Sequence, residues 1–200
     1  MRTFIIRARK GTTDYTKIQC SIGNRAHFEV IAHAIMNAFF VANGFRNDVD
    51  VYIVLDSSHN FPQTIKLSSQ EGLSIAGFHE QAILELIVSI LKNAQDLIKD
   101  TVKCLQPGVY IMGFGFEKLV QQFLKTHVLY VLDNKGIDIC KQKVDLNPVF
   151  ILSDHLAMPK KTLLGLKRQG VTTLSLGKKM LFASQCVTLL NYEMDRVNYE

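Results

Sequence analysis

The chain has 200 residues, of which 48% are hydrophobic, so it is long enough to bury one sizeable core and we expect a single domain over residues 1–200. Its 23 Lys and Arg against 18 Asp and Glu give a net charge of +5, which favours contact with polyanions such as RNA without requiring it. Glu85, Lys92 and Asp96 interrupt the most apolar long stretch, residues 81–99, which excludes a membrane span there and predicts a soluble, cytoplasmic protein.

Strands and helices alternate along the sequence. Short runs rich in β-branched and aromatic residues predict strands at 3–8, 49–55, 64–68, 109–112, 127–132, 148–152 and 171–176. The first run is read as a strand and not as a leader, because only three strongly apolar residues stand between its charges. Apolar residues at helical spacing predict helices at 27–42, 79–99, 116–125, 161–168 and 182–196. The alternation predicts an α/β fold with a largely parallel sheet flanked by helices.

Polar residues follow three of the late predicted strands. Asp133 comes after the first of them, Ser153, Asp154 and His155 come after the second, and Ser175 comes near the end of the third. In open α/β sheets, ligands bind beyond the carboxyl ends of the strands, so these three loops are a candidate site for one small polar molecule. The alternative is that they are ordinary turns.

The stretch "GFGFEK" at 113–118 resembles a fragment of the dinucleotide-binding motif G-x-G-x-x-G, but Lys118 stands where the third glycine should be. A nucleotide-dependent oxidoreductase is therefore a weaker alternative, and a plain loop–helix junction is the favoured interpretation. The sequence contains no P-loop, no H-E-x-x-H and no G-x-S-x-G, which removes the commonest nucleotide hydrolases, zinc peptidases and esterases.

Charged residues gather in two further places. Arg25, His27 and Glu29 lie together at the predicted start of an early helix, where they are either a reactive group or simple partners of the helix dipole. Basic pairs recur late in the chain and would rim the candidate pocket and contact RNA phosphates, unless they form a solvated face. These pairs are Lys160 and Lys161, Lys167 and Arg168, and Lys178 and Lys179.

The four cysteines lie far apart, with no C-x-x-C pair and no histidine nearby at metal-ligand spacing, so we expect free thiols and no metal site. They are Cys20, Cys104, Cys140 and Cys186. Cys186 lies on the helix after the third polar loop, with no histidine placed by the sequence to activate it. We therefore interpret it as a pocket wall and not as a nucleophile.

Five segments in the same order connect the chain to a known family. They are "AFF" (38–40), "PGVY" (107–110), "NPVFILSDH" (147–155), "TLSL" (173–176) and "QCVTLL" (185–190). Together they resemble the archaeal tRNA pseudouridine-54 N1-methyltransferases of the SPOUT superfamily, and the chain looks like the bacterial branch of that family. The resemblance implies a C-terminal trefoil knot that binds S-adenosylmethionine, a homodimer, and methylation of N1 of a pseudouridine in tRNA.

The resemblance also assigns roles to individual residues. It implies that the cofactor is bound by Leu132, Ser153, Leu176, Leu181 and Cys186. It further implies that Glu29 is the base or orienting group and that His27 contacts the RNA beside it. Where the archaeal enzymes have Gly-Asp-His this chain begins with Ser153, and His27 and Glu29 replace their Arg-x-Asp. Because of these changes, a non-catalytic RNA-binding module of the same fold is the main alternative.

Overall fold

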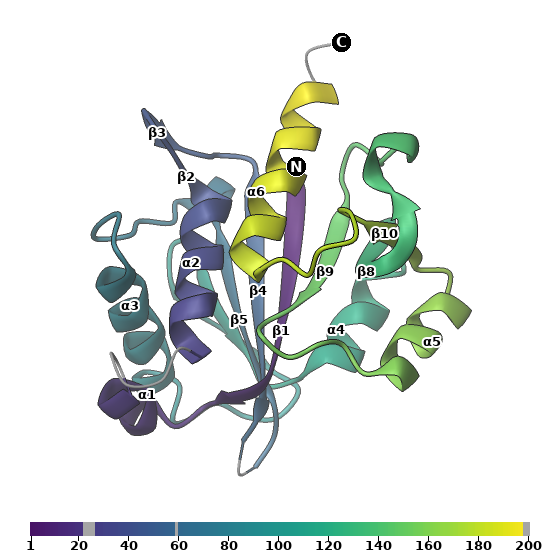
Figure 1. Cartoon of the computed structure of the whole chain (residues 1–200). Helices are drawn as coiled ribbons and strands as arrows, with labels where there is room; N and C mark the ends of the chain where they lie inside the picture. The colour runs from purple at the N-terminus through teal and green to yellow at the C-terminus, as the bar shows by residue number, and fades with distance from the viewer. Residues whose placement is uncertain (22–26, 59, 198–200) are drawn as a thin grey trace.

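A computed structural model describes residues 1–21, 27–58 and 60–197 of the chain. Within these ranges, eight strands form one sheet in the order β10-β8-β9-β1-β4-β5-β7-β6 (Figure 1). Their bounds are β1 Arg2–Thr12, β4 Val49–Ser57, β5 Gln63–Ser68, β6 Val102–Gln106, β7 Val109–Met112, β8 Leu129–Asp138, β9 Val149–Ser153 and β10 Thr172–Ser175. The short strands β2 (Phe40–Val41) and β3 (Gly44–Phe45) pair separately as a hairpin.

The sheet is parallel from β10 to β4 and antiparallel beyond it. β1 pairs in parallel with β4 and β9, and β8 does so with β9 and β10. β5, β7 and β6 then continue the sheet in antiparallel pairs. The predicted α/β fold with a largely parallel sheet is confirmed, although the antiparallel extension was not predicted. β1 lies at the centre because Phe4, Ile5 and Ile6 are apolar on both faces and are fully buried.

Helices cover both faces of the sheet. On one face lie α1 (Tyr15–Ser21), α2 (His27–Phe39), α3 (Glu80–Lys92) and α6 (Ala183–Val197), which share one core cluster with Phe4 and Ile6 of β1. On the other face lie α4 (Phe116–Phe123) and α5 (Lys160–Arg168), which pack around Ile5. In Figure 1, α2 and α6 lie in front of the sheet. Two short 3₁₀ helices, η1 (Ser69–Glu71) and η2 (Ile139–Lys141), complete the elements.

Several elements differ from the sequence-based expectations. The helix predicted at 27–42 ends at Phe39, and the strand predicted at 127–132 continues as β8 to Asp138. The helix predicted at 79–99 ends at Lys92 and is followed by turns, where Lys103 of β6 donates to the Asn93 carbonyl at 3.3 Å. α1 was not predicted; Asp14 caps it, with its Oδ1 accepting the N–H of Thr16 at 3.1 Å. β6 was missed because it is an edge strand with exposed and half-buried residues. Among the described residues, no helix has the length and apolar character needed to cross a membrane.

Candidate functional site

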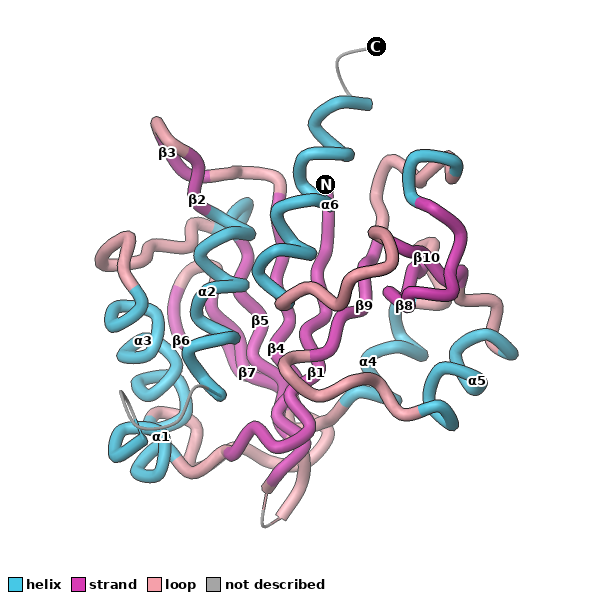
Figure 2. The backbone as a smooth tube through the Cα atoms, viewed as in Figure 1, coloured by secondary structure: helices cyan, strands magenta, loops and turns pink. Residues whose placement is uncertain are grey.

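The late strands end at one edge of the sheet. Val131 of β8 pairs with Ile151 of β9 and with Thr173 of β10, so the residues that follow each of them leave the sheet at similar heights. Figure 2 shows the loops after β9 and β10 as long segments that lead to α5 and α6. The register therefore brings Asp133, Ser153 and Ser175 to the same edge. The loop predicted to begin at Asp133 is wrong, because β8 continues through Asp133 to Asp138.

A segment of β8 is displaced next to β10. β10 pairs with β8 at Val131 and again at Ile137, so the residues between them leave the ladder. Gly136 ends this segment and lies against the backbone of β10. A Cβ at this position would lie 2.5 Å from the carbonyl carbon of Leu174 and 2.7 Å from the carbonyl oxygen of Thr173. Only glycine allows the displaced segment to approach β10 so closely.

Apolar side chains near these loops face the same layer of the core. Leu132, Leu176 and Cys186 are half-buried and pack against the same core cluster that α2 and α6 share. Leu181 is also half-buried, in the loop before α6. Burial raises the pKa of the Cys186 thiol to about 11, so it is protonated at neutral pH and suits a wall better than a nucleophile.

Polar groups of the β9 loop are fixed by the neighbouring strand. Ser153 is half-buried and pairs with Arg7 of β1, and the next N–H, from Asp154, donates to the Arg7 carbonyl at 3.3 Å. The buried carboxylate of Asp154 accepts the Leu156 N–H at 3.0 Å, and its other oxygen lies 3.6 Å from Nδ1 of His155. Asp154 therefore shapes the loop from inside.

These residues fit the cofactor that the sequence resemblance implies. S-adenosylmethionine has a flat adenine ring and polar ends, which require an apolar wall bordered by polar groups. The wall of Leu132, Leu176 and Cys186 supplies the first requirement. On β10, the buried hydroxyl of Thr173 has no hydrogen-bond partner in the part of the chain that the structure describes. No three His, Cys, Asp or Glu side chains of the described ranges gather as a metal site would require.

The predicted catalytic residues lie at the start of α2. Glu29 is half-buried in the first turn of this helix. In Figure 1, this end of α2 and the carboxyl ends of β1 and β9 all point toward the lower side of the molecule. The side chain of His27 and the whole of Arg25 lie outside the described residues. The role of Glu29 and its grouping with His27 and Arg25 therefore remain predictions.

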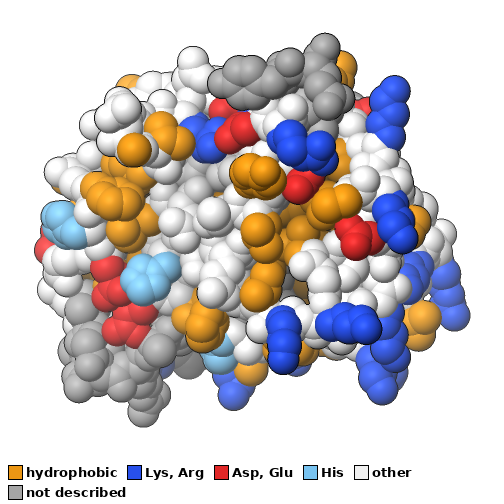
Figure 3. Space-filling view, turned by 45° about the horizontal axis from the view of Figure 1, so that its top comes forward, with side chains coloured by type: hydrophobic (Ala, Val, Ile, Leu, Met, Phe, Trp, Pro, Cys, Tyr) orange, Lys and Arg blue, Asp and Glu red, His pale blue; other side chains and the backbone are white. Residues whose placement is uncertain are grey.

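The late basic pairs are all exposed. Lys160, Lys161, Lys167 and Arg168 belong to α5, and Lys178 and Lys179 lie in the loop after β10. Figure 3 shows Lys and Arg side chains gathered along the right and lower right of the surface. They are therefore available to a polyanion beside the candidate cofactor loops.

Sequence reasoning missed a charged cluster at the same edge. The guanidinium of Arg7 donates to Asp56 at 2.7 Å and to Glu117 at 3.1 Å, and it lies 4.2 Å from the centre of the Phe116 ring. Burial raises the pKa of Asp56 more than its bonds to Arg7 lower it. A charged residue near the end of each of two apolar strands was the available signal.

Phe116 and Glu117 come from "GFGFEK", which forms a loop–helix junction as favoured from the sequence.

Two cavities lie elsewhere on the molecule. One, of about 270 Å³, is found where β1 and β4 end and the end of α3 covers them. The other, of about 410 Å³, lies between the end of α4 and the loop before β9. Neither of these two cavities is lined by the predicted cofactor residues.

Comparisons with known proteins agree on one family. A family model described as "Putative SAM-dependent RNA methyltransferase" matches residues 1–199. Curated relatives named "Putative pseudouridine methyltransferase" come from Photobacterium profundum, 45% identical over 195 residues (98% of this chain and 98% of the relative), and Vibrio cholerae, 42% identical over 195 residues (98% and 97%).

A solved structure shows the same fold. The crystal structure of Archaeoglobus fulgidus Nep1 bound to S-adenosylhomocysteine matches 100% of this chain and 99% of its own length, with a TM-score of 0.62 at 10% identity. This likeness supports the predicted SPOUT-type fold, while the trefoil knot remains a prediction. The match over 199 residues and the identity of the bacterial relatives decide the family. The chain belongs to this family of S-adenosylmethionine-dependent RNA methyltransferases.

Proposed function

We propose that this protein transfers the methyl group of S-adenosylmethionine to N1 of a pseudouridine in tRNA. The observation that carries the proposal is the meeting of three polar strand ends at one edge of the sheet, beside an apolar wall and a basic helix. The relatives' name supports pseudouridine as the acceptor. The resemblance of the sequence to archaeal enzymes supports tRNA as the RNA.

Leu132, Ser153, Leu176, Leu181 and Cys186 would hold the cofactor. The cofactor supplies a methyl group on a sulfonium, which leaves by in-line displacement. The chain's task is then to hold donor and acceptor at near-attack distance. Leu132, Leu176 and Cys186 pack on one core cluster, which gives a ring bound against them a fixed orientation.

Glu29 is the group we assign to the acceptor. The N1–H of pseudouridine must lose its proton before the nitrogen attacks, and a carboxylate within hydrogen-bond reach can accept that proton. Glu29 is half-buried in the first turn of α2. His27, the first residue of α2, would contact the RNA beside the reacting base.

The exposed basic side chains of α5 and of the loop after β10 would bind the phosphates of the RNA. Such contacts release counterions, so binding and methylation should fall steeply as salt is added. A base inside a folded tRNA loop must also be turned out of its stack to reach a protein site.

A second copy of the chain would cover α6. Phe182, Leu189 and Tyr192 are 65%, 39% and 60% exposed on or just before this helix. Figure 3 shows hydrophobic side chains in a band across the middle of this face. An exposed apolar band of this kind is typical of a protein interface and supports the proposed homodimer. The proposal also includes one domain over residues 1–200, a C-terminal trefoil knot and action in the cytoplasm.

Calorimetric titration with S-adenosylhomocysteine tests the cofactor site. Leu132→Arg and Cys186→Trp should each abolish binding, because they place bulk or charge in the apolar wall. Leu146→Arg and Cys104→Trp make the same chemical changes at exposed positions and should bind as the wild type does. Binding that survives the two wall substitutions in folded protein would remove the cofactor from these loops.

Methyl transfer to RNA tests the activity itself. Matched tRNAs that carry pseudouridine or uridine at the target position would be incubated with labelled cofactor, and the product nucleoside identified by mass spectrometry. We expect transfer to the pseudouridine RNA alone, and a large loss in Glu29→Gln but not in Glu85→Gln, which alters an exposed glutamate of α3. RNA binding without cofactor binding or transfer would favour the non-catalytic RNA-binding module instead.

A further inference from the structure

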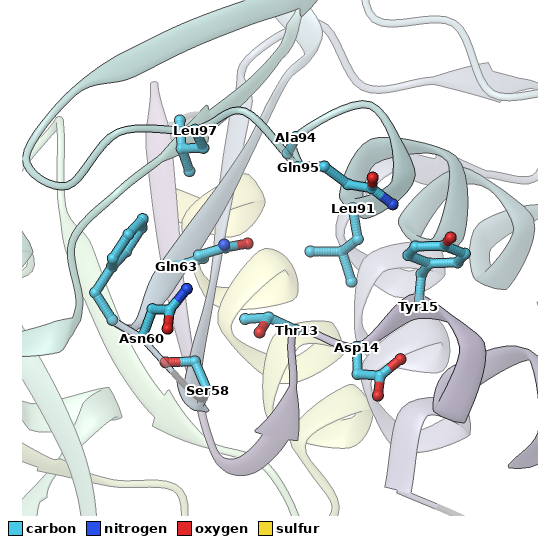
Figure 4. A pocket seen from close by; sticks show the side chains of 11 residues that line it. Thr13, Asp14, Tyr15, Ser58, Asn60, Gln63, Leu91, Ala94, Gln95 and Leu97 are labelled. Carbon is cyan, nitrogen blue, oxygen red and sulfur yellow. The ribbon is translucent and has the colours of Figure 1, made fainter.

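The cavity of about 270 Å³ lies at the same sheet edge as the candidate cofactor loops. Thr13 follows the end of β1, Ser58 follows the end of β4, and Gln63 begins β5. Leu91 and Gln95 come from the end of α3 and the turn after it, and form the opposite wall (Figure 4). Three separate segments thus build one hollow.

Carboxamide side chains dominate its polar lining. Asn60 and Gln63 point toward the same space in Figure 4, and Gln95 lies across from them. Gln63 is half-buried, and Asn60 and Gln95 are exposed, so this side of the hollow is open to solvent. Each amide offers a hydrogen-bond donor and an acceptor in one plane. The edge of a nucleobase carries acceptors and donors in the same arrangement and can therefore pair with such an amide. We call this hollow the amide pocket.

Apolar and aromatic side chains complete the amide pocket. Tyr15 and Phe61 are half-buried in its lining, and Leu91 and Ala94 are buried beneath it. Aromatic side chains stack on unpaired bases whatever their sequence. Pockets for drug-sized molecules begin at roughly 300 Å³, so a cavity of about 270 Å³ suits one flat ring and not a dinucleotide.

The charge of the lining favours a neutral base over a phosphate as the ligand. Asp14 is the one charged side chain among the described residues that line the amide pocket. Hydrogen bonds from Thr16 and Lys17 lower its pKa to about 2, so it is ionised at neutral pH. In Figure 4 its carboxylate points away from the amides. A negative charge at the rim repels phosphate, whereas a neutral base meets only amides and rings.

We propose that the amide pocket binds one unstacked base of the RNA substrate, a nucleotide near the one that is methylated. β4 and β9 lie on either side of β1, and the pocket residue Ser58 lies four residues beyond Val54, which is level with Ser153. Two strand spacings sideways and four residues along the strand place the pocket roughly 15 Å from Ser153. That separation suits a nearby nucleotide and is too large for the reacting base itself. The inference rests on the proposed function, because it assumes that the ligand is RNA.

Fluorescence anisotropy with two labelled probes tests the inference. One probe is a short oligouridylate, and the other is a sugar–phosphate oligomer of equal length without bases. The wild type should bind the oligouridylate more tightly. Gln63→Leu and Asn60→Leu should each weaken that binding about 10-fold while binding of the abasic probe is unchanged, because each removes hydrogen bonds to a base alone. Gln121→Leu, an exposed amide on α4, is the matched control and should change neither.

The outcomes separate this inference from the proposed function. Equal affinity of the wild type for both probes, or unchanged oligouridylate binding in Gln63→Leu and Asn60→Leu, would overturn the amide pocket as a base site. Failure to bind S-adenosylhomocysteine would overturn the proposed function whatever the probes show. Thermal unfolding reports whether each variant is folded. If Gln63→Leu or Asn60→Leu is unfolded, Gln95→Leu, at an exposed position on the opposite wall, takes its place.

Discussion

The guanidinium of Arg7 joins two strands and a helix at the carboxyl edge of the sheet, and its loss should destabilise the fold. The side chains of Arg7 and Asp56 are 12% and 19% exposed, and their charged atoms lie 2.7 Å apart. Removing one partner of a buried pair costs about 3–5 kcal/mol. Because both side chains keep some exposure and Met would still pack on the Phe116 ring, we expect Arg7→Met to lower the free energy of unfolding by about 3 kcal/mol.

Urea unfolding of Arg7→Met and a matched control measures this loss. Glu117→Gln is the control, because Glu117 also bonds Arg7 but its side chain is 74% exposed, so its loss should stay below about 1 kcal/mol. Adding Asp56→Asn to Arg7→Met should restore part of the stability, with a coupling free energy of about 2 kcal/mol. A coupling near zero, or equal losses in Arg7→Met and Glu117→Gln, would refute the reasoning.

The same variant should show a particular dependence on pH. Burial raises the pKa of Asp56 above its ordinary value of 3.8, despite the bonds to Arg7 that lower it. The folded state therefore takes up this proton at a higher pH than the unfolded state. As the pH falls through the folded-state pKa of Asp56, the contribution of this residue to the free energy of unfolding increases. Below the pKa that Asp56 has in the unfolded chain, the contribution is constant. Without the Arg7 cation this increase should be larger, so the deficit of Arg7→Met should shrink from about pH 7 to about pH 4.

Two further predictions concern the candidate cofactor loops. Gly136→Ala should lower the free energy of unfolding by about 2 kcal/mol or more and weaken S-adenosylhomocysteine binding, because its Cβ would lie 2.5 Å from the backbone of β10. Gly165→Ala in α5 has nothing within 4 Å and should instead stabilise by about 0.5–1 kcal/mol; similar losses in both variants would contradict this. Cys186, with its pKa raised to about 11, should alkylate more slowly than exposed Cys104, and S-adenosylhomocysteine should slow Cys186 alone, as peptide mass spectrometry would report.

Elements whose signal is burial could be predicted from the sequence. The apolar run at 148–152 is β9, and the helical spacing at 27–42 is α2, whose Ile31, Ile35 and Ala38 are fully buried. Elements that form only because they pair with another segment could not be predicted in this way. β6 begins with Val102, 56% exposed, and exists because it pairs with β7. The turns after α3 contact Lys103 of β6, a residue beyond the helix that no local pattern identifies.

The candidate site divides in the same way. Polar residues after apolar strands predicted that the late loops would meet, because parallel strands end at a common edge. The pairing of Arg7 with Asp56 depends on the register between β1 and β4, which the sequence does not show. The amide pocket depends on three segments, and amides such as Gln63 are ordinary loop or strand residues until those segments meet.

The central strand β1 connects the two candidate binding sites. Arg7 pairs with Ser153 of β9 on one side and with Val54 of β4 on the other, and Thr13 continues the chain from the end of β1 into the amide pocket. The Arg7 guanidinium already bonds Asp56 and Glu117, so this cation holds the edge together and is not available to the RNA. Phosphates must then be met by exposed side chains such as those of α5. A fixed edge with a separate basic surface lets the RNA approach without disturbing the strand that both sites share.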